Sequence, residues 1–111
     1  MTHAMNLHHA PFVKVKEGTK TLELRLYDEK RAAISPGDTI VFTDTETGES
    51  VECLVLELFR YPSFRELYAR HDKISIGYEE HEKADPDDLL TIYSQKSSDK
   101  FGVVGIGIRK L

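Results

Sequence analysis

Residues 21–27 constrain the fold most, because apolar and polar side chains alternate strictly along them. Leu22, Leu24 and Leu26 occupy every second position, and other residue types stand between them. Successive side chains of a β-strand point to opposite faces, so a period of two predicts a strand. We expect the leucine row to face the core, with a polar row of mixed charge on the other face.

Turn and capping signals predict the remaining elements. Strands are expected at residues 39–43, 51–59 and 101–110, with a further strand beginning near residues 6–7. Short helices are expected at residues 11–17, 63–68 and 85–93. Gly18 follows the first helix, and Ser63 and Asp85 are suited to cap the other two. The apolar run 51–59 predicts a strand covered on both faces. Strands dominate without a repeating strand–helix–strand rhythm, which predicts an α+β fold, mainly β, with a small barrel and flanking helices.

The length and the charge distribution limit the functional classes. A chain of 111 residues predicts one domain spanning residues 1–111. The net charge is −4, and residues 37–58 carry six acidic and no basic side chains. Residues 1–36 carry six basic and four acidic side chains. Strong non-specific binding to duplex DNA requires many phosphate contacts, so we expect any nucleic-acid surface to be local and near the first third.

Other classes of site are not indicated. No run of about 18 apolar residues is present, so we expect no membrane partner. Residues 1–10 are polar and lack the apolar centre of a signal peptide, which favours a cytoplasmic location. The single cysteine, Cys53, stands in an apolar run and is interpreted as a packing residue. The five histidines lack the spacing of metal ligands, and we expect neither a metal nor a cofactor.

The segment 18–25 gathers the residues most suited to chemistry. Gly18 permits a sharp turn, and Lys20 stands where the strand begins. Thr21, Glu23 and Arg25 then project from one strand face, so the row extends over about 15 Å. Arginine offers a planar fork to a phosphate or a base, and glutamate accepts from an exocyclic amine. The alternative interpretation is a solvent-exposed face with weak cross-strand ion pairs.

The same segment resembles a family signature. Residues 18–25 read Gly-Thr-Lys-Thr-Leu-Glu-Leu-Arg and resemble the Gly-x-Lys-Thr-x-Glu-x-Arg motif of the ASCH (activating signal cointegrator homology) domain. The resemblance continues at residues 34–42, 92–94 and 101–106, and it covers nearly the whole chain. It implies a PUA-like β-barrel of the small stand-alone prokaryotic type. It also implies that RNA or a nucleotide binds in a polar cleft beside the Lys20–Arg25 strand.

The resemblance and the residue chemistry together define the expected ligand site. Its candidate ligand-binding residues are Lys20, Thr21, Glu23, Arg25, Tyr93 and Ser94. Tyr93 is suited to stack on a base and Ser94 to contact a phosphate. The expected partner is single-stranded RNA or a nucleoside or nucleotide, and the oligomeric state stays open.

The resemblance also implies an alternative enzymatic function. Some small ASCH proteins are amidohydrolases that act on N4-acetylcytidine with a lysine, a threonine and a distant glutamate. The lysine falls on Lys20, Glu23 stands at the threonine position, and the distant glutamate falls on Glu79 or Glu80. The acidic run 79–88 favours a solvated loop, with a carboxylate wall of the cleft as the alternative. An amidohydrolase on this or a related modified nucleoside, a ribonuclease and a scaffold without a ligand all stay open.

Overall fold

The computed structural model describes residues 1–111, and one five-stranded sheet organises them. Its strands are β1 (Thr2–Leu7), β2 (Leu22–Leu26), β3 (Thr39–Asp44), β4 (Ser50–Tyr61) and β5 (Val103–Lys110). The helices are α1 (His9–Glu17), α2 (Glu29–Ala32), α3 (Phe64–Arg70) and α4 (Gln95–Phe101), with a 3₁₀ helix η1 (Pro86–Thr91). No helix has the length and apolar character that crossing a membrane requires.

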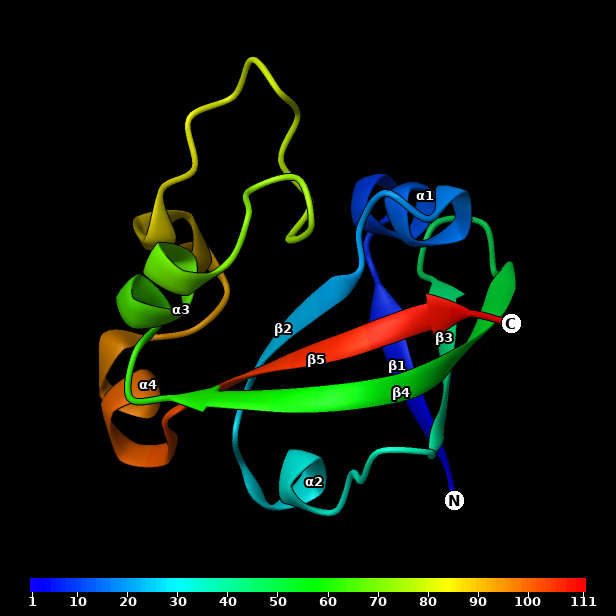
Figure 1. The fold of residues 1–111 in the computed structure, drawn as a ribbon, viewed down its shortest axis with the longest axis horizontal. Helices are drawn as coiled ribbons and strands as arrows, with labels where there is room; N and C mark the ends of the chain where they lie inside the picture. Colours follow the sequence, from blue (N-terminus) through cyan, green and yellow to red (C-terminus); the bar gives the residue numbers. More distant parts are fainter.

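The sheet is curled but not closed (Figure 1). The strand order is β1-β3-β4-β5-β2, with β1 parallel to β3 and the other pairs antiparallel. A register shift between Val55 and Glu57 bends β4, as β-bulges commonly do. The edge strands β1 and β2 do not pair through their backbones. The predicted α+β architecture is confirmed, and the sheet forms a half-barrel where the sequence predicted a small barrel.

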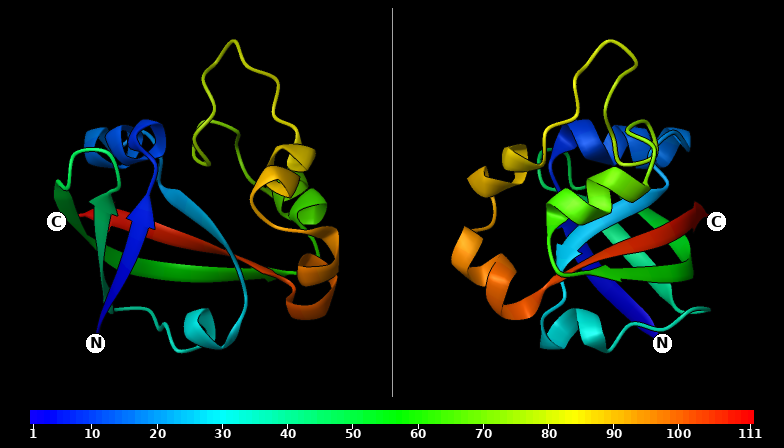
Figure 2. Two further views of the ribbon diagram at one scale, coloured as in Figure 1. Left: turned by 180° about the vertical axis from the view of Figure 1, so that it is seen from behind. Right: turned by 60° about the vertical axis from the view of Figure 1, so that its left-hand side comes forward.

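The helices cover different parts of the half-barrel. In Figure 1, α1 lies at one end of the curled sheet and α2 at the opposite end, whereas α3 and α4 lie together on one flank. Figure 2 shows that η1 lies on the same flank beside α3. The chain between α3 and η1, residues 71–85, loops out beyond β2 on the side where α1 lies. This arrangement brings α1, β2, η1 and that loop around one end of the sheet.

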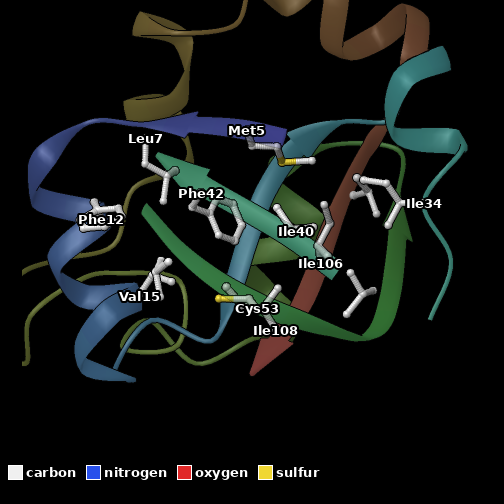
Figure 3. Packing of buried hydrophobic residues seen from close by; sticks show 13 residues of the cluster. Met5, Leu7, Phe12, Val15, Ile34, Ile40, Phe42, Cys53, Ile106 and Ile108 are labelled. Carbon is white, nitrogen blue, oxygen red and sulfur yellow. The ribbon is translucent and has the colours of Figure 1, made fainter. Parts of the chain in front are cut away.

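The main core fills the inside of the curl (Figure 3). Phe42 on β3 and Ile106 on β5 are completely buried, and Phe12 and Val15 on α1 close one end. Cys53 is also completely buried, and burial raises the pKa of its thiol to about 11. Its position agrees with the interpretation as a packing residue.

Leu22 and Leu24 of β2 are buried, as the sequence predicts, but in a second core outside the curl. Leu22 and Leu24 are buried with Phe64 and Leu67 of α3 rather than inside the curl. The half-buried Leu26 packs against the same cluster. The polar face of β2 therefore lies on the inside of the curl, where Glu23 pairs in register with Ile106 of the main core. The alternation of apolar and polar residues shows which side chains share a face of the strand. It does not show which face turns toward the inside of the curl.

Several elements differ in extent from the predictions. Helix α1 begins two residues earlier than expected and ends as predicted at Gly18, whose φ of 86° is left-handed. Ser63 and Asp85 cap α3 and η1 through their side chains. β1 begins four residues earlier than expected, and α2 and α4 were not predicted. Buried and exposed side chains alternate along the first half of β4, and Glu52 is exposed. The prediction that both faces of this strand are covered is therefore wrong.

Candidate functional site

A pocket of about 400 Å³ lies at the open edge of β2. It is bounded by the end of β1, by α1 and α3, and by the chain from residue 76 to η1. Charged and polar side chains of β2 line it on one side, and apolar and aromatic side chains line it on the other. The principal polar residues are Asn6, Lys14, Lys20, Glu23, Arg25 and Glu82, and the principal apolar and aromatic residues are Pro11, Tyr68, Ile76, Tyr78, Leu89, Ile92 and Tyr93.

The carboxylate of Glu23 lies between the two cations of this strand. Its Oε1 accepts a hydrogen bond from Nζ of Lys20 at 2.8 Å and another from the backbone N–H of Leu24 at 3.2 Å. Its Oε2 accepts from Nε and Nη2 of Arg25 at 3.1 and 2.9 Å. Glu23 is only 3% exposed and Lys20 only 8%. Both oxygens of the carboxylate are therefore occupied by donors of the protein itself.

The charges of this cluster favour the ionised form of Glu23. Burial by itself would raise the pKa of the Glu23 carboxyl, but the charges of Lys20 and Arg25 outweigh it and hold the pKa below its usual value. Two positive charges and one negative charge leave the cluster positive. Nζ of Lys20 makes one of the three hydrogen bonds that it can donate. The cluster therefore suits an anionic group of a ligand.

The edge position of β2 adds a backbone acceptor to the pocket. The N–H of Tyr27 donates to the C=O of Gly102 at 3.0 Å, which directs the backbone groups of odd-numbered residues toward β5. By the alternation of an antiparallel ladder, the N–H and C=O of Leu24 point to the open edge. The N–H is bound by the carboxylate of Glu23, so the C=O of Leu24 is the acceptor that the strand offers to a ligand.

Three tyrosines form the aromatic part of the wall. Tyr93 stacks on Phe64 with ring centroids 5.7 Å apart and an interplanar angle of 20°. Burial raises the pKa of Tyr93, so its hydroxyl is neutral and can donate. The hydroxyls of Tyr68 and Tyr78 are 2.9 Å apart, and Tyr78 also donates to Oδ2 of Asp88 at 2.7 Å. These bonds fix two tyrosine rings at the pocket, while the hydroxyl of Tyr93 is free for a ligand.

The chain that covers the pocket is fastened to α1. Nζ of Lys14 donates to the backbone C=O of Gly77 at 2.5 Å and forms an ion pair with Glu79 at 3.2 Å. Gly77 has a φ of 112°, a conformation that favours glycine. A Cβ at this position would lie 3.4 Å from Cδ of Lys20. The glycine is therefore favoured by its backbone conformation, because a Cβ would make only an ordinary contact with the lysine.

The structure brings four of the sequence-predicted residues to this pocket and places the others elsewhere. Lys20, Glu23, Arg25 and Tyr93 line it. Thr21 is exposed and lies outside it, because Lys20 stands between the pocket and a smaller hollow that Thr21 lines.

The serine and the distant glutamates also lie away from the pocket. Ser94 caps α4 by accepting from the N–H of Ser97 at 3.1 Å, a role missed because this helix was not predicted. Glu79 turns toward Lys14, and Glu80 is exposed. The glutamate of the acidic run that lines the pocket is Glu82.

Sequence reasoning missed most of the apolar and aromatic wall. Tyr68, Ile76 and Tyr78 come from α3 and from the chain after it, where no periodic pattern marks a pocket. Only the tertiary contact between this chain and α1 brings them to β2. The structure contains no group of three or more histidine, cysteine or acidic side chains arranged to hold a metal ion.

Comparisons with known proteins agree with this architecture. The model of the ASCH domain family matches residues 5–111. The crystal structure of the hypothetical protein PH0355 is similar over the whole of both chains, with 30% identity and a TM-score of 0.85. The solution structure of protein PF0455 from Pyrococcus furiosus is 31% identical and has a TM-score of 0.73, covering 100% of this chain and 98% of the other.

A more distant structure shares the fold alone. The ASCH domain from Lactobacillus crispatus is 12% identical, with a TM-score of 0.64 over 98% of this chain and 79% of that chain. No curated protein matches the sequence.

Proposed function

The chain belongs to the ASCH domain family, whose PUA-like fold is linked to RNA binding, and from this premise we propose that it binds RNA or a nucleotide in the pocket beside β2. One observation carries the proposal: the positive cluster of Lys20, Glu23 and Arg25 lines a cavity that is also lined by tyrosines. The volume of about 400 Å³ lies within the range of small-molecule sites, which is about 300–1,000 Å³.

The proposed pose uses each wall for a different part of the nucleotide. A phosphate contacts the guanidinium of Arg25 and the ammonium of Lys20, which are the two cations that β2 and the residues before it bring to the pocket. The base lies against the ring of Tyr93 and the apolar side chain of Ile92, which is exposed at the pocket. The C=O of Leu24 then accepts from an amino or imino group of the base.

The state of Glu23 favours binding over catalysis. A general base needs a lone pair directed at the proton that it removes and a pKa near the working pH. Both oxygens of Glu23 accept hydrogen bonds from the protein, and neighbouring cations lower its pKa. We therefore assign Glu23 the task of holding Lys20 and Arg25 in place, which needs no chemical step.

Titration with two ligands tests the proposal. The probes are a fluorescein-labelled pool of random single-stranded RNA octamers and the four unlabelled ribonucleoside monophosphates. Both are expected to bind wild type, and the octamer affinity is expected to fall with salt. With two or three phosphates neutralised, log K against log salt should have a slope of about −1.4 to −2.1.

Matched arginine variants provide the control. Arg25→Gln removes a cation from the pocket. It should lower the affinity for both ligands about tenfold, because each ligand loses its phosphate contact. Arg70→Gln removes an exposed arginine on α3 that does not line the pocket and makes no ion pair. This variant should bind both ligands like wild type. Wild-type protein that binds neither probe at low salt would refute the proposal.

A further inference from the structure

A second hollow lies farther along the same strand. It has a volume of about 320 Å³ and is lined by Tyr27, Arg60, Tyr61, Pro62, Phe101, Gly102 and Val103. Its lining is aromatic and apolar apart from one arginine, and no carboxylate contributes to it. The composition contrasts with the chain as a whole, whose net charge is −4.

The arginine of this hollow is exposed and makes no ion pair. The guanidinium carbon of Arg60 lies 3.8 Å from the ring centroid of Tyr27, so the group lies over the face of the ring. No carboxylate lies within 4.0 Å of it, unlike Arg25 and Arg31, which both pair with acids. Because Arg60 is exposed and makes no ion pair, its N–H groups can donate to a phosphate.

The exposed aromatic ring of the hollow belongs to Phe101. Its side chain is 38% exposed at the end of α4, and Nζ of Lys100 lies 5.1 Å from its ring centroid. Lys100, like Arg60, makes no ion pair. Single-stranded nucleic acids are bound by this combination of cations with exposed aromatic rings, because every base has a face that can stack.

Sheet register connects the hollow with the first pocket. Val104 on β5 pairs with Arg25 on one side and with Arg60 on the other. Directly paired residues project from the same face, so the two arginines share a face at a Cα separation of about 10 Å. Tyr27 follows Arg25 on that face about 7 Å along the strand. The strand therefore places a residue of the second hollow, Tyr27, two positions beyond a residue of the first pocket, Arg25.

We propose that the hollow over Tyr27 and Arg60 is a second nucleotide subsite, and that the ligand is a single strand of RNA at least two nucleotides long. This inference rests on the proposed function, because the first nucleotide occupies the pocket beside β2. In the second subsite, Arg60 contacts the phosphate between the two nucleotides, and Phe101 stacks on the second base. An acidic peptide is a poorer occupant, because a single arginine in an aromatic hollow offers it little to contact.

The two subsites are separated by comparing the octamer pool with the mononucleotides. Arg60→Gln should weaken octamer binding about fivefold or more and leave mononucleotide binding unchanged. It should also make the salt slope less steep by about 0.7, because one phosphate contact is lost. Phe101→Ala should lower the affinity for the octamer by a similar factor, and the slope of log K against log salt should stay unchanged. Arg70→Gln is the matched control, and thermal unfolding curves confirm that each variant is folded.

The other possible results would refute either the second subsite alone or both proposals. If both hollow variants bind the octamer like wild type while Arg25→Gln weakens both ligands, the second subsite is refuted and the proposed function stands. If wild type binds neither ligand, both proposals fail. If polyglutamate displaces the octamer from wild type but not from Arg60→Gln, the hollow recognises acidic peptides and the RNA subsite is refuted.

Discussion

The guanidinium of Arg25 on β2 donates from Nη2 to the backbone C=O of Asn6 on β1 at 2.8 Å. These are the two edge strands of the half-barrel, and no backbone hydrogen bond joins them. The same Nη2 also donates to Glu23. A single side chain thus joins the open edges of the sheet at the pocket that we propose as the nucleotide site.

Arg25→Lys should loosen this connection while keeping the charge. An ammonium group cannot reproduce the planar fork that contacts Glu23 and the C=O of Asn6 together. We expect a loss of about 1.5–3 kcal/mol in the free energy of unfolding, the range for hydrogen bonds to charged groups. Amide hydrogen exchange should accelerate in β1 and β2. Arg109→Lys, at an exposed position of β5, is the control, and equal exchange in both variants would contradict the assignment.

Glu23→Gln should be the more destabilising change, although it is nearly isosteric. It removes the negative charge between two largely buried cations and leaves them to repel each other. Removing one partner of a buried ion pair typically costs about 3–5 kcal/mol, and urea unfolding should show a loss of that order. Glu52→Gln, at an exposed site without an ion pair, should unfold like wild type. A loss below about 1 kcal/mol would indicate that the cluster is well hydrated.

The sequence predicts that the charged side chains of the candidate site lie close together, and the reason is physical. Lys20, Glu23 and Arg25 fall within six consecutive residues, so a strand alone brings them together. The alternation could not tell which face of β2 turns inward, because that choice depends on partners distant in the chain. Leu22 and Leu24 pack on α3, whose apolar residues fill the flank of the sheet. The polar row consequently lines the inside of the curl.

The aromatic wall was beyond local reasoning. Tyr68 and Tyr78 reach the pocket through the chain after α3, which Lys14 fastens to α1. No local periodicity encodes such a contact between distant segments. Ser94 was interpreted as a phosphate ligand, although the spacing of Ser94 and Ser97 fits the start of a helix, where its hydroxyl is used. Short polar helices such as α4 carry little apolar signal and are easily missed.

His9 should make stability depend on pH. Its Nδ1 lies 2.7 Å from Oδ2 of Asp44, and this hydrogen bond raises the pKa of His9 above its usual value of 6.5. Because the folded-state pKa is raised, the stabilisation is complete below pH 6.5 and is lost as the pH rises through the raised pKa. Burial would raise the pKa of Asp44, but the bond to His9 helps to hold it below 3.8. The contribution of Asp44 is therefore complete above pH 3.8 and lost as the pH falls through the lowered pKa.

Urea midpoints measured from pH 3 to pH 9 test this dependence. Wild type should be most stable between about pH 4 and 6.5 and should lose stability on the alkaline side. His9→Gln should remove most of the alkaline slope, because the hydrogen bond to Asp44 then no longer depends on a proton of residue 9. His81→Gln changes an exposed histidine without a hydrogen-bonded partner and should retain the slope. An alkaline slope equal in wild type and His9→Gln would show that another group titrates.

Hydrolysis of N4-acetylcytidine should be slow or absent in the wild type. The covalent route needs a hydroxyl nucleophile near Lys20, and Glu23 occupies the position three residues later. A route through water needs Glu23 as the base, but its oxygens are occupied and its pKa is lowered. We expect release of cytidine, followed by liquid chromatography, to stay far below the 1 s⁻¹ at the low end of ordinary turnover.

Substitutions at position 23 distinguish these routes. If water is activated by Glu23, any slow background should disappear in Glu23→Gln, which keeps the shape of the side chain and removes the base. Glu23→Thr places a hydroxyl near Lys20 and releases Lys20 from its ion pair, so cytidine release should rise above that of wild type. Thermal unfolding must first show that both variants are folded at the assay temperature, because each leaves two cations without their carboxylate. Fast wild-type turnover that neither substitution alters would place the chemistry at other residues of the pocket, with the hydroxyl of Tyr93 as the next to substitute.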